Sequence, residues 1–289
     1  MQAINNCWLT MITSIKKYDL AVAYRIYPKI SKEPFFDFNS KLELAELSLH
    51  SFREATNTLQ IKIWALLDDC PPNYKELFLK YFPKGDLEFI ILKGEGNRNT
   101  FHRQIEILCT QKDSDLVYFA EDDYLYMPGQ SSLLTGFLHE NPGAFVSPYD
   151  HSDNYSYEIN QRGNSIKLFN NHHFRTANST CLTFMTSCQT LQRTRKVFES
   201  YSDGNHDASL WFSLTKPNFI YPLWHLRQMF CDRFVMSLAA RAWRYCSVQI
   251  LAGKKRQLWV PIPSIATHLD KPFVAPAVDW AKIKSELEM

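Results

Sequence analysis

The sequence predicts an α/β protein with a central, mainly parallel β-sheet and helices on both faces. Apolar runs of strand length alternate with amphipathic runs of helical spacing through residues 18–150. Two of the apolar runs end in acidic residues, which would gather at the carboxyl edge of a parallel sheet. The length of 289 residues, with 45% hydrophobic and 21% charged residues, indicates a globular protein with a substantial core.

Strands and helices alternate through the first half of the chain. Ser40 and Glu43 match a capping box, so a helix is expected to start there. The polar turn at 70–73 introduces a second, shorter helix, and residues 94–99, GEGNRN, form a loop. The remaining predicted helices are 100–111 and 131–140, and the predicted strands are 19–28, 59–69, 87–93, 115–123 and 143–150.

The second half is less regular. Residues 151–180 are polar and rich in Asn, His and Ser, and no element is predicted there. No linker separates the halves, so residues 1–289 are predicted to form a single domain with two functional lobes, 18–150 and 151–289. The predicted strands here are 181–187 and 257–270, and the predicted helices are 188–201, one within 203–214, and 223–245.

Three consecutive acids, Glu121, Asp122 and Asp123, end the predicted strand VYFAEDD. Neighbouring carboxylates repel one another and are costly to desolvate. Mg²⁺ and Mn²⁺ bind carboxylates together with substrate phosphates, so a cation held against a diphosphate would remove the repulsion. The acids therefore predict a metal site. The alternatives are a solvated acidic loop, or a turn that Asp123 forms with Pro128.

The stretches LLDD, GEGNRNTFHRQIEI and VYFAEDDYLY, in this order and spacing, resemble the nucleotide-sugar half of GT-A glycosyltransferases, in particular the family 2-like group. The resemblance covers about residues 18–150, and residues 175–270 more loosely. It implies a Rossmann-like GT-A fold, with nucleotide-sugar binding in 18–150 and an acceptor-binding, catalytic lobe in 151–289. The family's DXD motif is EDD here, and its usual PTYNR-like sequence is missing after the first strand.

The resemblance also implies roles for single residues. Asp123 would bind the metal directly, and Glu121 and Asp122 would contact the ribose or the donor sugar. Arg103 would meet the diphosphate, although an ion pair with Glu106, three residues on, is an equal alternative. The nucleobase would be held by the remaining strand-end residues: Asp68 or Asp69, Tyr24 and Arg25.

NHDASLW, residues 205–211, resembles the stretch that supplies the catalytic base of inverting members. Asp207 would be that base, while the alternative is that Asp207 or Asn205 only caps a helix. Glu158 is the next candidate for the base. A late histidine is a metal ligand in many of these enzymes, which implies His268 for that role. The histidines that compete with it are His172, His173 and His206.

The leading prediction is a metal-dependent inverting glycosyltransferase that uses Mn²⁺ or Mg²⁺. The expected donor is a UDP-sugar and the expected acceptor a glycan or lipid-linked hydroxyl. Transfer would be of hexosyl or N-acetylhexosaminyl type, in surface glycan or polysaccharide biosynthesis. A nucleotidyltransferase that makes a nucleotide sugar is the first alternative, but the glycine-rich loop expected of such an enzyme is missing from YRIYPKISKEP. A non-catalytic binding module of the same fold is the second alternative.

Charge and cysteine content indicate where the protein acts. A net charge of +2 gives no electrostatic basis for nucleic-acid binding. Seven cysteines without a CxxC pair, and no recognisable signal peptide or transmembrane span, indicate a cytoplasmic protein with reduced thiols. The basic, aromatic stretch 223–245 leaves peripheral association with the inner membrane surface open, against the alternative of a core-packed helix.

Overall fold

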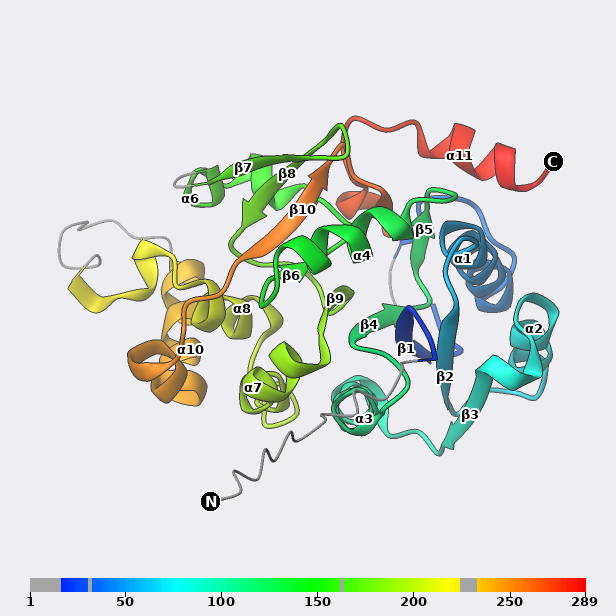
Figure 1. Ribbon diagram of the computed structural model, residues 1–289, viewed down its shortest axis with the longest axis horizontal. Coiled ribbons are helices and arrows are strands. Elements are labelled where there is room, and N and C mark those ends of the chain that lie inside the picture. Colours follow the sequence, from blue (N-terminus) through cyan, green and yellow to red (C-terminus); the bar gives the residue numbers. More distant parts are fainter. Residues whose placement is uncertain (1–16, 31–32, 162–163, 224–232) are drawn as a thin grey trace, which may run out of the picture.

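The computed structural model describes residues 17–30, 33–161, 164–223 and 233–289. Among these residues, nine strands form one sheet in the order β3-β2-β1-β4-β9-β6-β10-β8-β7 (Figure 1). The strands are β1 (Leu20–Ile26), β2 (Ile61–Asp68), β3 (Leu87–Leu92), β4 (Leu116–Glu121), β6 (Phe145–Val146), β7 (Ile166–Phe169), β8 (His172–Ala177), β9 (Phe184–Ser187) and β10 (Leu258–Ile262).

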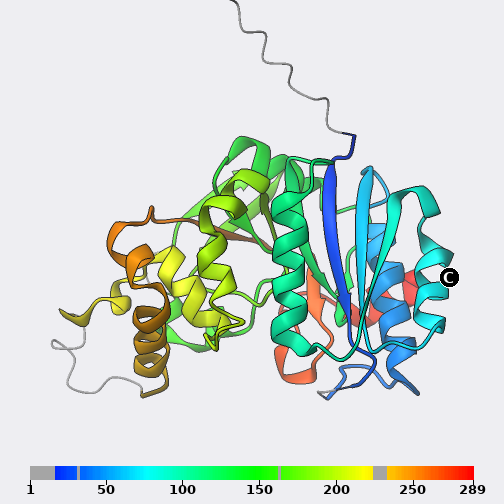
Figure 2. The ribbon, with the colours of Figure 1, turned by 90° about the horizontal axis from the view of Figure 1, so that it is seen from below.

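The first-half strands β3, β2, β1 and β4 pair in parallel, so their carboxyl ends lie at one edge of the sheet. All seven residues of β1 are buried, because helices cover both faces. Figure 2 shows α1 (Lys41–Ala55) on one face and α3 (Gly96–Thr110) on the other. This confirms the predicted α/β class with helices on both faces of a central sheet.

Antiparallel pairing dominates beyond β4. Strand β9 runs antiparallel between β4 and β6, and β10 pairs in parallel with β6 and antiparallel with β8. The predicted strand 143–150 is reduced to β6, and a β7–β8 hairpin occupies part of the polar stretch for which no element was predicted. Strands from both predicted lobes therefore share one sheet.

Two further strands form a separate small sheet that positions the site. β5 (Tyr124–Tyr126) follows the three acids directly and pairs antiparallel with β11 (Ala266–His268). The pairing sets His268 opposite Tyr124. A residue near the end of the chain is thus brought beside Asp123, although 145 positions separate the two in sequence.

Helix starts agree with the capping chemistry in the sequence. The Ser40 side chain accepts a hydrogen bond from the Glu43 amide at 3.3 Å, as the capping box predicts. The Glu43 carboxylate accepts a hydrogen bond from the Asn39 amide at 2.8 Å, where a full capping box would use the Ser40 amide. The other helices are α2 (Asn73–Tyr81), α4 (Ser131–Glu140), α5 (Asp153–Ser156), α6 (Glu158–Gln161), α7 (Cys188–Glu199), α8 (Asp207–Thr215), α10 (Arg233–Ala252) and α11 (Trp280–Leu287).

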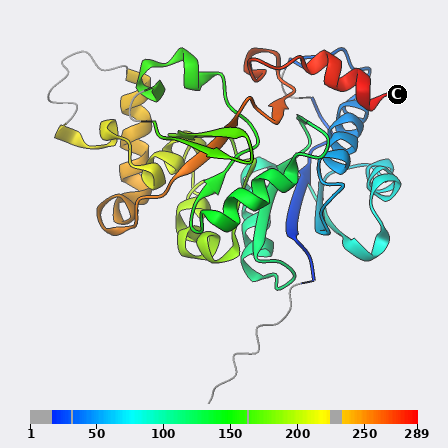
Figure 3. The ribbon, with the colours of Figure 1, turned by 45° about the horizontal axis from the view of Figure 1, so that its top comes forward.

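The two ends of the molecule differ in what they pack against. The C-terminal helix α11 lies beside α1 (Figure 3), and its Trp280 is buried in the same core cluster. Helix α10 packs instead on α8, at the far end of the molecule from α2 (Figure 1). Residues 224–232 of the predicted helix 223–245 lie outside the described residues. Within the part of the chain that is described, no helix is both long and apolar enough to cross a membrane.

Candidate functional site

A cavity of about 480 Å³ opens at the carboxyl ends of the parallel strands, which is where ligands bind in open α/β sheets. We call it the strand-end cavity. Eight of its lining residues are charged, and five of these form the ion pairs described below. The lining residues are Arg25, Ile26, Tyr27, Lys29, Lys41, Asp68, Asp69, Gly94, Gly96, Asn97, Thr100, Glu121, Asp122 and Asp123.

Glu121, the first of the three acids, is neutralised by Arg25 of the neighbouring strand. The two residues face each other in the β1–β4 register, and the guanidinium forms an ion pair with the Glu121 carboxylate. Burial disfavours a charged Arg25, but the adjacent Glu121 outweighs this and raises the pKa of the guanidinium. The other carboxylate oxygen of Glu121 accepts a hydrogen bond from Thr183 at 2.8 Å.

Asp122, the second acid, is compensated from helix α1. Lys41 Nζ lies 3.0 Å from its carboxylate, and the Tyr27 amide donates to the same oxygen at 3.3 Å. Burial raises the pKa of Asp122 to about 6, Lys41 opposes the rise, and the charge of Asp123 adds to it. The Asp122 side chain therefore points toward Lys41, whereas that of Glu121 points toward Arg25.

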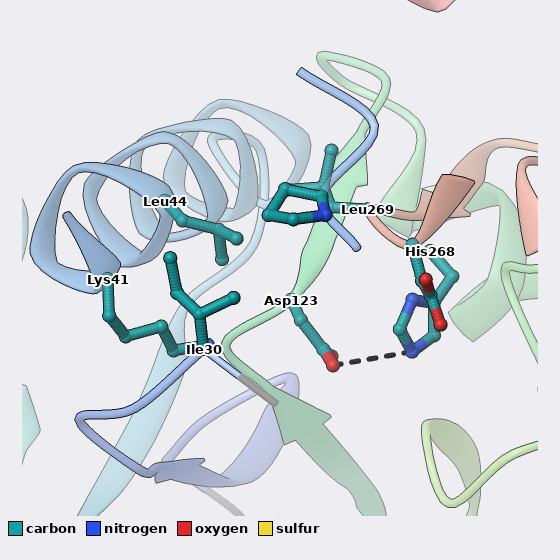
Figure 4. A pocket seen from close by; sticks show the side chains of 8 residues that line it. Ile30, Lys41, Leu44, Asp123, His268 and Leu269 are labelled. Atoms are coloured by element: carbon teal, nitrogen blue, oxygen red, sulfur yellow. Dashed lines mark ion pairs between the residues drawn. The ribbon is translucent and has the colours of Figure 1, made fainter. Parts of the chain in front are cut away.

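Asp123, the third acid, pairs with His268 across the β5–β11 sheet (Figure 4). Asp123 Oδ2 lies 3.3 Å from His268 Nε2, and the Asp123 carbonyl accepts a hydrogen bond from the Leu269 amide at 2.7 Å. Each acid thus has its own partner on a different element. This arrangement explains how three adjacent carboxylates are tolerated at the end of a buried strand.

The Asp123–His268 pair has the geometry of two neighbouring metal ligands. Bonds of about 2.1 Å at a right angle to one cation place two ligand atoms roughly 3 Å apart. Among the described residues, no group of three or more His, Cys, Asp or Glu side chains is assembled to hold a metal. One carboxylate completed by diphosphate oxygens and water matches the usual Mg²⁺ pattern in phosphate-handling sites, whereas an imidazole ligand is more typical of transition metals.

The two acids at the end of β2 have separate surroundings. Asp68 is buried, and its two carboxylate oxygens accept hydrogen bonds from the Glu95 and Gly96 amides at 2.7 and 2.8 Å. It therefore anchors the turn between β3 and α3, where Gly94 and Gly96 adopt φ of +71° and +77°. Asp69 is exposed at the wall of the cavity, so it is the better placed of the pair for the predicted nucleobase contact.

Tyr24 and Arg103 lie outside the strand-end cavity. Tyr24 points to the opposite face of β1 from Arg25, is fully buried, and shares a hydrogen bond with Ser48 at 2.9 Å. Tyr24 and Arg25 were expected to contact the nucleobase together. Because neighbouring side chains of a strand point to opposite faces, only Arg25 lies in the cavity. The Arg103 side chain, 48% exposed, pairs with Glu106 at 3.1 Å and Glu95 at 3.3 Å, which is the alternative that the sequence left open.

Three cavity residues were not predicted from the sequence. Lys29 and Lys41 supply positive charge next to the acids, and Asn97 binds the Arg25 guanidinium. A signal was present for Lys41 alone, because it directly follows the predicted helix cap Ser40. Asn97 reaches Arg25 because the start of α3 packs against the end of β1, which no local pattern reveals.

A second cavity of about 290 Å³, which we call the C-terminal cavity, lies in the other half of the molecule. His268 lines it, whereas Asp123 lines the strand-end cavity, so the Asp123–His268 pair stands between the two. Its walls mix polar and aromatic side chains. They include His151, Asp153, Asn154, Tyr157, Asn160, Ser179, Thr180, His206, Asp207, Phe212, Phe234, Leu238 and Phe273.

Asp207 lies in this cavity as the first residue of α8. The cap position is His206, not Asn205 or Asp207, although the Asp207 carboxylate also accepts a hydrogen bond from a first-turn amide. Asp207 Oδ1 lies 2.6 Å from His206 Nδ1 and accepts a hydrogen bond from the Ala208 amide, also at 2.6 Å. Burial raises the pKa of Asp207, but His206 and the Ala208 amide together outweigh burial and lower it.

The other histidines have different places. His151, which was not singled out from the sequence, lines the C-terminal cavity between Tyr149 and Phe273, and burial lowers its pKa. His172 and His173 start β8 and line neither cavity. The side chain of Glu158 lies outside the described part of the structure.

Comparisons with known proteins give structural neighbours only. No family model matches the sequence, and no curated protein matches it. The chain is similar to a solved structure of the galactosyltransferase LgtC in complex with donor and acceptor sugar analogues, with 12% identity, 92% of this chain and 94% of that chain covered, and a TM-score of 0.45.

The chain is also similar to a CMP:2-keto-3-deoxy-manno-octonic acid synthetase complexed with CTP. The identity is 10%, the covered shares are 68% of this chain and 86% of that chain, and the TM-score is 0.41. Because both likenesses are distant, the function has to be argued from the geometry of the site itself.

Proposed function

We propose that the protein is a divalent-cation-dependent glycosyltransferase of the GT-A type that moves a sugar from a nucleotide donor to a hydroxyl acceptor. One observation carries the proposal: Asp123 and His268 lie 3.3 Å apart, at the junction of two cavities. A group-transfer enzyme needs a place for each substrate and a charged centre where they meet. The two cavities and this pair fit that requirement.

The strand-end cavity suits the nucleotide diphosphate. Its volume of about 480 Å³ lies within the usual range of small-molecule sites. Lys29 and Lys41 can attract the phosphates, while the exposed carboxylate of Asp69 can accept a hydrogen bond from a base or ribose. A uridine diphosphate sugar is the donor we expect. Arg25 holds Glu121 in place, which leaves Glu121 in reach of the donor sugar.

Asp123 Oδ2 and His268 Nε2 are the atoms that would hold Mn²⁺ or Mg²⁺. When bound, such a cation neutralises the negative charge that develops on the departing diphosphate. Other contacts within the chain orient the two ligand atoms and reduce the charge repulsion around them. Burial of His268 and its pairing with Asp123 orient both ligand atoms, and Lys41 compensates the neighbouring Asp122, which reduces repulsion within the acid cluster.

The C-terminal cavity suits the acceptor. Its aromatic walls can pack against the apolar faces of a sugar ring or a lipid-linked group, while its polar groups can bind hydroxyls. The His206–Asp207 pair supplies basic groups to the same cavity. Direct displacement by the acceptor oxygen, assisted by this pair, would invert the configuration at the anomeric carbon.

The test is to incubate the protein with a panel of nucleotide sugars and candidate acceptors, with Mn²⁺, Mg²⁺ or a chelator. We expect transfer or slow donor hydrolysis with one donor, loss of either in chelator, and inversion seen by NMR of the product. Failure of every donor, together with no thermal stabilisation by nucleoside diphosphates, would contradict the proposal. Pyrophosphate release from a nucleoside triphosphate would favour a nucleotidyltransferase. Tight diphosphate binding without turnover would favour a binding module.

A further inference from the structure

We propose that His206 Nε2 takes the proton of the acceptor hydroxyl, and that Asp207 acts as the positioning residue for His206 instead of as the base. This inference rests on the proposed function, because it assigns a role within the same reaction. It starts from the 2.6 Å contact between His206 Nδ1 and Asp207 Oδ1.

The contact fixes which ring nitrogen carries the proton. An ionised carboxylate can only accept hydrogen bonds, so a nitrogen 2.6 Å from Asp207 Oδ1 has to be the donor. The Ala208 amide lies 3.3 Å from His206 Nδ1 but only 2.6 Å from Asp207 Oδ1. The carboxylate is therefore the partner of this amide, and Nδ1 is left to donate. In a neutral ring, Nε2 then has the lone pair.

The surroundings of His206 keep this nitrogen within reach of an acceptor. His206 and Asp207 line the C-terminal cavity, with side chains 46% and 35% exposed. The charged or titratable groups around them are Arg241 of α10, which donates to the Gly204 carbonyl at 3.3 Å, and His151 and Asp153 on the other wall. The hydrogen bond to Asp207 raises the pKa of His206, and burial and Arg241 oppose the rise.

The proposed step balances as follows. The acceptor O–H bond breaks and its proton moves to Nε2, which forms an imidazolium that the Asp207 carboxylate stabilises. The freed electron pair on the oxygen forms the bond to the anomeric carbon. The bond from that carbon to the diphosphate oxygen breaks, and its electrons leave with the diphosphate. Asp207 is suited to the supporting role, because its lowered pKa makes it a weak base.

The experiment compares rate–pH profiles of the full chain with Mn²⁺, using the donor and acceptor found in the panel above. We expect a wild-type rate that falls toward acid with a pKa above about 6.5, the usual value for histidine. His206→Asn, which keeps a good helix cap, should be about 10²- to 10⁴-fold slower than wild type. Its rate should also no longer decrease toward acid pH. In Asp207→Asn, the decrease in rate toward acid should occur at a lower pH than in wild type. His139→Gln, on the exposed end of α4, should match wild type.

Imidazole rescue separates a proton acceptor from a structural residue. Glycine is tolerated at a helix cap, so His206→Gly should fold and should regain part of its rate in added imidazole. A wild-type profile flat from pH 5 to 8, together with a His206→Asn rate within threefold of wild type, would make Asp207 the base and overturn the inference. Absence of rescue in a folded His206→Gly variant would overturn it too.

A spectroscopic readout keeps this inference distinct from the proposed function. If no donor is turned over, the proposed function fails, yet ¹⁵N spectra of the histidine rings still report the His206 tautomer. We expect the Nδ1–H form, with a pKa that falls in Asp207→Asn. A predominant Nε2–H form in wild type would overturn the inference.

Discussion

At the scale of single residues, the two acids that end β2 should separate folding from binding. Asp69→Ala should weaken nucleotide binding by about five- to a hundred-fold, the equivalent of one lost hydrogen bond of roughly 1–3 kcal/mol, with little change in melting temperature. Isothermal titration with nucleoside diphosphates measures this. Normal affinity in the variant would reduce Asp69 to a surface charge.

Asp68→Ala should affect stability more than nucleotide binding. It removes the acceptor of the Glu95 and Gly96 amides, so the free energy of unfolding should fall by roughly 1–3 kcal/mol or somewhat more. Denaturant unfolding measures this, with Asp203→Ala, an exposed acid outside both cavities, as the matched control. An Asp68→Ala variant as stable as wild type would contradict the anchoring role.

At the scale of elements, the pair between β1 and β4 should stabilise the sheet edge on which the acids stand. Arg25 and Glu121 are mostly buried, and removal of one partner of a buried ion pair costs about 3–5 kcal/mol because the other charge is left uncompensated. Arg25→Met and Glu121→Gln should each destabilise the protein, and the double variant by less than the sum. Additive losses in a double-mutant cycle would show that the two side chains do not interact.

The exposed face of α10 carries the prediction about membranes. Phe234 is exposed in its first turn, and Val248 and Leu251 are exposed beyond a kink at Cys246. Arg241 and Arg244, which precede the kink, are exposed as well. Such a surface suits an anionic bilayer. We expect flotation with anionic vesicles at low salt and less of it in Arg241→Gln/Arg244→Gln. Absence of flotation at low salt would leave α10 as a helix with a solvated basic edge.

The sequence predicted elements well where one local pattern controls them. Buried strands such as β1 and β2, and the capped start of α1, follow from apolar runs and a capping box. The β7–β8 hairpin was missed because its strand residues are largely polar or exposed. Tyr24 was misplaced because strand alternation sends neighbouring side chains to opposite faces, and only the packing of α1 decides which face is core.

At the scale of the whole molecule, the site depends on contacts distant in sequence. The acids and His268 were predicted as candidates, but not that β11 would pair with β5 and set them together. The ion-pair partners of Glu121 and Asp122 come from β1 and α1, and no spacing rule connects them with residues 121–123. The sequence therefore predicted the candidate residues, and the structure shows which side chains they contact.

The central claim is that Asp123 and His268 together hold the divalent cation, and Mn²⁺ electron paramagnetic resonance tests it most directly. In the presence of nucleoside diphosphate, wild type should bind one Mn²⁺ per chain, with spin-echo modulation from a coordinated imidazole nitrogen. His268→Gln should lose that modulation, and Asp123→Asn should bind Mn²⁺ at least tenfold more weakly. Imidazole modulation that persists in His268→Gln, or wild-type Mn²⁺ affinity in Asp123→Asn, would contradict the account.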